Sequence, residues 1–118
     1  MCRIFISMYR WLVTQPDLNS HKTLHGGILM KWIDESAGME ARLITGKSCV
    51  TRYISNIDFV ATAKCGDIIE VCIKPYAIGN TSITFSATVK NKMAGLIAVV
   101  DRIVFVAVDE DGIPTSIK

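Results

Sequence analysis

The segment GGILMKWIDESAGMEARLITG, residues 26–46, decides the fold because it holds the one convincing helical pattern in the chain. Gly26-Gly27 opens the helix, which we expect to run to about Ile44, and Thr45-Gly46 supplies its C-terminal stop. At about 100° per residue, apolar side chains collect in a stripe on one side and in a second area on the far side. The stripe contains Met30, Ile33, Ala37, Ala41 and Ile44, and the second area contains Ile28, Trp32, Met39 and Leu43. We therefore expect a sheet against one side of the helix and a partner surface against the other.

Strand patterns flank this helix. Before it, residues 3–14 are rich in Ile, Phe, Tyr, Trp and Val and favour a strand that stops at Pro16-Asp17. After it, four strands are expected, at residues 48–60, 67–76, 82–90 and 96–108. The third alternates apolar residues with Ser and Thr, which predicts a strand with one solvent-exposed face. The apolar run 96–100 predicts a central strand that is covered on both faces. The order predicts one α+β domain, spanning residues 1–118, with a single antiparallel sheet curled around the helix.

Composition narrows the classes of function. The 118 residues, half of them apolar, fit one compact domain, and 13 basic residues scattered among 11 acidic ones make nucleic-acid binding a poor expectation. The four cysteines form no CxxC pair and have no nearby His, which favours reduced thiols in the cytoplasm over a zinc or redox site. Neither a membrane span nor a signal-peptide cleavage pattern is expected. Because the chain contains no phosphate loop, metal-ligand cluster or serine elbow, we expect no cofactor.

Asp34 is the first candidate for chemistry. It lies at the border of the helix stripe, where packing would partly bury a carboxylate that could act as a general base or nucleophile. The alternative is an ordinary acid beside a partly solvated helix face. Glu35 falls on the polar sector with Lys31 and Arg42, and Glu40 borders the opposite edge of the stripe.

The start of the helix offers a second set of groups. At His25-Gly26-Gly27, unpaired backbone N–H groups would point outward, and glycine lets a ligand approach the main chain. Such donors suit an oxyanion or a polarised carbonyl, although a plain glycine-containing N-terminus is the alternative. Asp34 lies eight residues beyond Gly26, hence about 12 Å along the axis, too far for one small carbonyl to touch both. If both act on one carbonyl, they come from different subunits of a homodimer whose helices lie side by side.

Two weaker candidates remain. His21 and His25 could act as general bases, but no oriented Ser or Cys partner accompanies them, and loop packing is an equal alternative. The string Gly79-Asn80-Thr81-Ser82 could supply main-chain or hydroxyl contacts to a ligand, although such a string is more often only a hairpin turn.

An ordered set of motifs resembles a known family. The segments Asp17-Leu18-Asn19, Leu24-His25-Gly26-Gly27 and Trp32-Ile33-Asp34 resemble the D-x-N, G-G and D signature of hotdog acyl-CoA thioesterases of the YciA and cytosolic acyl-CoA hydrolase type. Further segments follow in the family's order and spacing, so the resemblance covers nearly all of residues 8–114. They are Val50-Thr51, Ile57-Asp58-Phe59, Gly66-Asp67, Gly79-Asn80-Thr81-Ser82-Ile83 and Phe105-Val106-Ala107-Val108-Asp109.

The resemblance implies a hotdog fold, in which about five strands wrap one helix, and hydrolysis of acyl-CoA to a free fatty acid and coenzyme A. It implies that Asp34 activates water or attacks the thioester, and that the main chain at Gly27 polarises the carbonyl. The segment from Gly79 to Ser82 would lie near the pantetheine or nucleotide part of coenzyme A, and Lys90, Lys92 and Arg102 are candidates for its phosphates by charge and position. Further candidates for substrate binding are Asn19, Thr23, His25 and Gly26, with Thr23 standing where some relatives carry Asn or Asp. Members of this family commonly form dimers or trimers of dimers.

Other functions stay open on the same fold. A non-catalytic acyl-CoA binding or sensing protein is one, although a pure binder has no need of Asp34 facing the thioester. A hydratase or dehydratase of this fold would use a His, and His25 lacks the proline-rich surroundings of that family. A purely structural role is the remaining alternative, because a fold does not fix a function.

Overall fold

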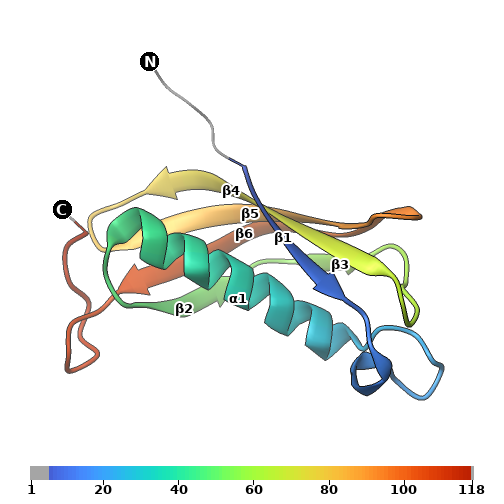
Figure 1. The fold of residues 1–118 in the computed structure, drawn as a ribbon. Helices are drawn as coiled ribbons and strands as arrows, with labels where there is room; N and C mark the ends of the chain where they lie inside the picture. Colours follow the sequence, from blue (N-terminus) through green and yellow to red (C-terminus); the bar gives the residue numbers. More distant parts are fainter. Residues whose placement is uncertain (1–5, 118) are drawn as a thin grey trace.

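The computed structural model describes residues 6–117, and in them an antiparallel sheet curves around one long helix (Figure 1). The elements are β1 (Ser7–Leu12), the 3-10 turn η1 (Gln15–Asp17), α1 (Gly26–Thr45), β2 (Cys49–Ile54), β3 (Ile57–Phe59), β4 (Ile68–Ile78), β5 (Ser82–Asn91) and β6 (Gly95–Ala107). The strand order in this six-stranded sheet is β1-β4-β5-β6-β2, and β3 also pairs with β6. The α+β prediction is confirmed. Cys2 and the first three residues of the predicted first strand, 3–5, lie outside the described residues.

Both ends of α1 lie where the sequence predicts them. At the start, the Nδ1 atom of His25 accepts a hydrogen bond from the backbone N–H of Gly27, at 2.9 Å. At the end, Gly46 adopts a left-handed conformation with φ of 70°, and its N–H donates to the carbonyl of Arg42. A residue without a Cβ enters this conformation at no steric cost, so glycine ends the helix cleanly.

The side of α1 that faces the sheet differs from the predicted stripe. Met30 and Ile44 are exposed, whereas Leu29 and Trp32 are buried, because the buried arc is centred further round the helix. Trp32 packs on Trp11 of β1, with ring centroids 5.3 Å apart. The buried residues of the helix are Leu29, Trp32, Ile33, Ser36, Ala37, Glu40 and Ala41. The second apolar area is therefore divided between the core and an exposed remainder formed by Met39 and Leu43.

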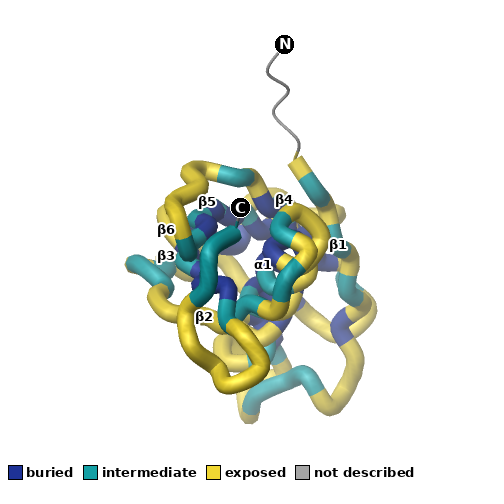
Figure 2. Tube along the Cα trace, turned by 90° about the vertical axis from the view of Figure 1, so that its left-hand side faces the viewer, coloured by how far each residue is buried: buried dark blue, intermediate teal, exposed yellow. Residues whose placement is uncertain are grey.

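The alternating pattern of β5 is confirmed, because its apolar residues are buried between the sheet and α1 while its Ser and Thr residues are half-buried on the other face. Figure 2 shows this arrangement, with buried segments gathered where the sheet faces the helix. The covered face carries Ile83, Phe85, Ala87 and Val89. These residues and the helix arc form one continuous core.

Two strand predictions are wrong. The predicted strand 48–60 is divided into β2 and β3 at Ser55, whose N–H and side-chain oxygen both bond to the backbone of Arg102. The run 96–100 does lie in a central strand, but Leu96 and Val99 are 45% and 37% exposed. The single helix covers only one face of the sheet, so the opposite face of this run stays open.

None of the helices in residues 6–117 combines the length and the apolar character that a membrane span requires.

Candidate active site

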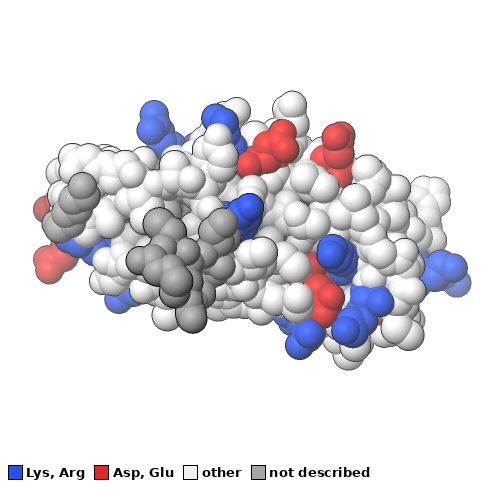
Figure 3. Space-filling model, turned by 90° about the horizontal axis from the view of Figure 1, so that it is seen from above, with Lys and Arg blue, Asp and Glu red and all other residues white. Residues whose placement is uncertain are grey.

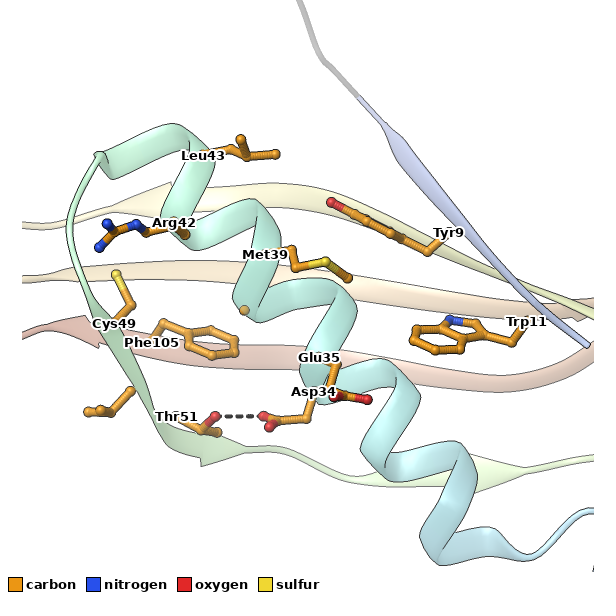
Figure 4. Close-up of a pocket in the computed structure, with 12 residues that line it drawn as sticks. Tyr9, Trp11, Asp34, Glu35, Met39, Arg42, Leu43, Cys49, Thr51 and Phe105 are labelled. Atoms are coloured by element: carbon orange, nitrogen blue, oxygen red, sulfur yellow. Dashed lines mark hydrogen bonds between the residues drawn. The ribbon is translucent and has the colours of Figure 1, made fainter. Parts of the chain in front are cut away.

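Asp34 lies half-buried on the middle of α1, on the side that faces β2. Its Oδ1 atom accepts a hydrogen bond of 2.6 Å from the hydroxyl of Thr51 in β2 (Figure 4). No other hydrogen bond reaches this carboxylate from the residues that the structure describes. A carboxylate has two acceptor oxygens, so Oδ2 is left to accept from water or a substrate while Thr51 fixes the orientation of the group.

The carboxylate opens onto a groove of about 890 Å³ that crosses the exposed side of α1 from β1 to β2 (Figure 4). The walls are mostly apolar, with a few polar groups among them. The lining residues are Tyr9, Trp11, Asp34, Glu35, Gly38, Met39, Arg42, Leu43, Cys49, Val50, Thr51 and Phe105. A mostly apolar groove with a small number of placed polar groups is typical of a site for a small organic ligand.

Tyr9, which lines the groove, forms a partly buried hydroxyl–carboxylate pair with Glu40 that the sequence does not predict. The hydroxyl of Tyr9 donates to Oε1 of Glu40 at 2.6 Å, and Glu40 is only 8% exposed. Burial raises the pKa of Tyr9 well above its usual range, and the hydrogen bond and the charge of Glu40 raise it further. The phenol thus satisfies a carboxylate that α1 carries into the core, and the pair supports the wall of the groove.

The raised pKa of Tyr9 predicts a loss of stability at high pH. The folded protein holds the phenolic proton more tightly than the unfolded chain does, so this stabilisation is complete below a pH of about 10, the ordinary value for tyrosine, and declines as the pH rises further. We expect Tyr9→Phe to be less stable than wild type at neutral pH and to lose less stability between pH 9 and 11. Urea unfolding across this range measures both, and parallel curves for the two proteins would contradict the prediction.

The helix N-terminus differs from expectation at Gly27. The sequence predicts an unpaired N–H there, but the imidazole of His25 accepts from it, because His25 is the N-cap of α1. The ring lies against the glycine, since a Cβ at Gly27 would lie 3.1 Å from two of its atoms. His25 is exposed, as is His21 in the preceding loop. The first-turn amide and the imidazole therefore form one local unit at the surface.

Three of the predicted binding residues come together beside this unit. Asn19, Thr23 and Gly26 line a small cleft of about 170 Å³, whose wall also includes Phe59 of β3. The side chain of Asn19 holds the loop in shape, because its oxygen accepts from the N–H of Thr23 at 3.1 Å and its amide donates to the Thr23 hydroxyl at 3.0 Å. Thr23 therefore acts here as a partner of Asn19.

The predicted binding segment Gly79-Asn80-Thr81-Ser82 is not part of either opening within one chain. It forms the β4–β5 hairpin turn, closed by the bond from the N–H of Gly79 to the carbonyl of Ser82 at 2.8 Å. In Figure 1 this turn lies at the end of the molecule where α1 finishes, whereas the Asn19 loop lies at the end where α1 begins. One chain thus separates the predicted substrate-binding residues into two groups.

The candidate phosphate ligands are also apart from the groove. Lys92 lies 3.9 Å from the carboxylate of Glu70, while Arg102 donates to the hydroxyl of Tyr76 and stacks over its ring. Figure 3 shows basic and acidic side chains interspersed over the face seen from above. Within residues 6–117, no three His, Cys, Asp or Glu side chains come close enough together to hold a metal ion.

Comparison with known proteins relates this chain to thioesterases. The sequence model of the thioesterase superfamily matches residues 21–98. The chain is 32% identical over 107 residues to the uncharacterized acyl-CoA thioester hydrolase YkhA of Bacillus subtilis, a match that covers 86% of this chain and 61% of that protein. It covers only 14% of the acetyl-coenzyme A thioesterase of Mus musculus, at 35% identity over 80 residues. The chain thus spans less than two thirds of the length of these curated relatives.

Solved structures agree with the fold. An apo-hexameric acyl-CoA thioesterase superposes with a TM-score of 0.84 at 31% identity, over 94% of this chain and 74% of that one. The acyl-CoA hydrolase of Staphylococcus aureus, solved with butyryl coenzyme A and coenzyme A, superposes with a TM-score of 0.80 at 29% identity, over 94% of this chain and 68% of that one.

Proposed function

The chain belongs to the thioesterase superfamily, and from this premise we propose that it hydrolyses acyl-CoA thioesters to a free fatty acid and coenzyme A. The observation that carries the proposal is the half-buried carboxylate of Asp34, which Thr51 orients at the edge of a groove large enough for an acyl-pantetheine group. The names of the relatives, acyl-CoA thioester hydrolase and acetyl-coenzyme A thioesterase, support the same reaction and substrate class.

In this reaction Asp34 acts as a general base toward water or as the nucleophile itself. Attack on the thioester carbon pushes negative charge onto the carbonyl oxygen, and a backbone N–H at the start of a helix stabilises that charge. We assign this role to Gly27, so the carbonyl oxygen takes the place of the His25 imidazole as acceptor. If Asp34 is the base, water supplies the new hydroxyl group, the C–S bond breaks, and the coenzyme A thiolate takes up the proton that Asp34 removed from water, so the acyl group leaves as the acid. If Asp34 is the nucleophile, breaking of the C–S bond leaves a mixed anhydride on Asp34, which water then hydrolyses to the acid and the free carboxylate.

We propose that the site is shared between two subunits. Asp34 and the first turn of α1 are about 12 Å apart along one helix, so a second helix running the opposite way must bring its own first turn to Asp34. The same arrangement places the hairpin at Gly79 of one chain near the Asn19 loop of the other, and it covers Met39 and Leu43, which are 43% and 74% exposed. The hexameric thioesterase that superposes on this chain supports trimers of such dimers.

The setting we propose is the cytoplasm, with fatty acid metabolism as the context and residues 1–118 acting as one thioesterase domain. The free thiols of Cys49, Cys65 and Cys72 support a reducing compartment.

The proposal is tested by the release of free thiol from a panel of acyl-CoA esters, from short to long and including aryl groups. We expect turnover of at least part of the panel by the purified protein. Binding of acyl-CoA without thiol release would replace hydrolysis by a binding or sensing role. Addition of water to an enoyl-CoA without loss of the thioester would indicate a hydratase instead.

A further inference from the structure

Gly38 follows Asp34 by one helical turn on the same flank of α1, facing β2 and Phe105. We infer that Gly38 determines which acyl chains the protein accepts, because the acyl chain lies in the space that the missing side chain leaves beside Phe105. This inference rests on the proposed thioesterase function and adds the place of the acyl chain and the residue that sets its limit.

Nothing in the backbone requires glycine at this position. Gly38 is not among the residues with positive φ, and it lies in the helix interior, where glycine is less favourable than alanine. A Cβ there would lie 3.5 Å from Cε2 of Phe105, which is an ordinary contact. Alanine therefore fits at this position and would stabilise the helix. We attribute the glycine instead to the room that it leaves for the acyl chain.

The far wall of this space is rigid. Phe105 is 2% exposed, and its ring packs edge-on against Phe85 with centroids 6.2 Å apart. The ring cannot turn away without opening a void in the core, and close-packed interiors resist such changes. A larger side chain at Gly38 would therefore fill the space instead of pushing the wall back.

The chemistry of the lining favours the acyl chain over the nucleotide part of the substrate. The reacting carboxylate of Asp34 lies at one end of this space, and Cys49 of β2 and Phe105 lie beyond it (Figure 4). Val50 of β2 also lines the groove and adds to its apolar walls. The apolar part ends at Arg42, which donates to the hydroxyl of Ser48 at 3.2 Å. Burial of a hydrocarbon chain against such apolar walls is favourable. Phosphate groups need polar partners, which these walls do not provide.

The test compares Gly38→Leu, Gly38→Ala and wild type on acetyl-CoA and decanoyl-CoA. We expect Gly38→Leu to lower kcat/KM for decanoyl-CoA by roughly a hundredfold, from steric exclusion and lost apolar contact, and to change acetyl-CoA turnover less than about threefold. Gly38→Ala should raise the Tm by roughly 4 °C through its helix propensity and lower decanoyl-CoA turnover by less than Gly38→Leu does. Met30→Leu is the matched control, because Met30 is an exposed residue of α1 outside the groove and the change alters side-chain shape at nearly constant volume.

Each outcome decides the inference. Equal losses on both esters would place Gly38 at the carbonyl and overturn it, as would unchanged decanoyl-CoA turnover in Gly38→Leu. A fall in oligomer mass for Gly38→Leu, measured by light scattering, would make Gly38 an interface residue and also overturn it. If wild type hydrolyses neither these two esters nor any other member of the acyl-CoA panel, the proposed function itself fails. Wild-type turnover with no selective effect of Gly38→Leu is the failure of this inference alone.

Discussion

Replacing Asp34 by Asn is expected to lower kcat for acyl-CoA hydrolysis by roughly a hundredfold or more, which is the size of effect that loss of a general base produces. The substitution keeps the side-chain volume and can still accept from the Thr51 hydroxyl through its amide oxygen, so the fold and the groove should be unchanged. Thiol release under saturating substrate measures the effect. A Tm within about 2 °C of wild type would show that the loss is chemical.

Thr51→Val completes this test, because valine has nearly the shape of threonine and removes only the hydroxyl. If Thr51 orients the carboxylate, Thr51→Val should lower kcat by about tenfold, as loss of one hydrogen bond to a charged group allows. Adding it to Asp34→Asn should cause little further loss, since the two act as one unit. Full activity of Asp34→Asn would make this carboxylate structural and remove the basis of the proposed mechanism.

The sequence predicts the fold well where local signals act alone. The double glycine, the helical periodicity and the Thr45-Gly46 stop place α1 within a residue of its observed bounds, and the alternation in residues 82–90 places β5 equally well. The errors come from tertiary packing. Helical periodicity places Ile44 in the buried stripe, but the sheet leaves it exposed, and the break at Ser55 depends on hydrogen bonds to Arg102 of a strand far along the chain.

In the candidate site, too, local features can be predicted from the sequence, whereas contacts between distant segments cannot. The sequence predicts Asp34 as a candidate because the border of an apolar stripe is a local property of the helix. The sequence indicates Thr51 only as part of the Val50-Thr51 motif, because nothing in this segment shows that β2 brings the hydroxyl to a carboxylate 17 residues earlier. The contact between Tyr9 and Glu40 joins residues 31 apart, and no periodicity predicts it. The cap on Gly27 is local, but His25 is not one of the residue types that N-caps prefer, which are Ser, Thr, Asp, Asn and Gly, so the usual N-cap preference does not indicate it.

Mixing two inactive variants should restore activity if the site is shared between subunits. Gly27→Pro removes the N–H that we assign to the carbonyl, and proline is tolerated in a first helical turn, where the N–H has no intrahelical acceptor. Loss of one oxyanion donor costs about a hundredfold or more in kcat, so both Gly27→Pro and Asp34→Asn should be nearly inactive alone. In a mixed dimer, one of the two sites combines an intact Asp34 from one chain with an intact Gly27 from the other.

After equal amounts of the two variants exchange subunits, half of the dimers are mixed and each has one intact site, so the mixture should recover about a quarter of wild-type activity. Gly27→Ala is the control, because it keeps the N–H and its Cβ meets only the exposed ring of His25, at 3.1 Å. Native mass spectrometry of one isotope-labelled variant verifies that exchange occurred. Exchange without recovery would place Asp34 and the carbonyl-polarising group in the same chain, and the separation of about 10 Å between Gly27 and Asp34 along α1 would then require a donor other than Gly27.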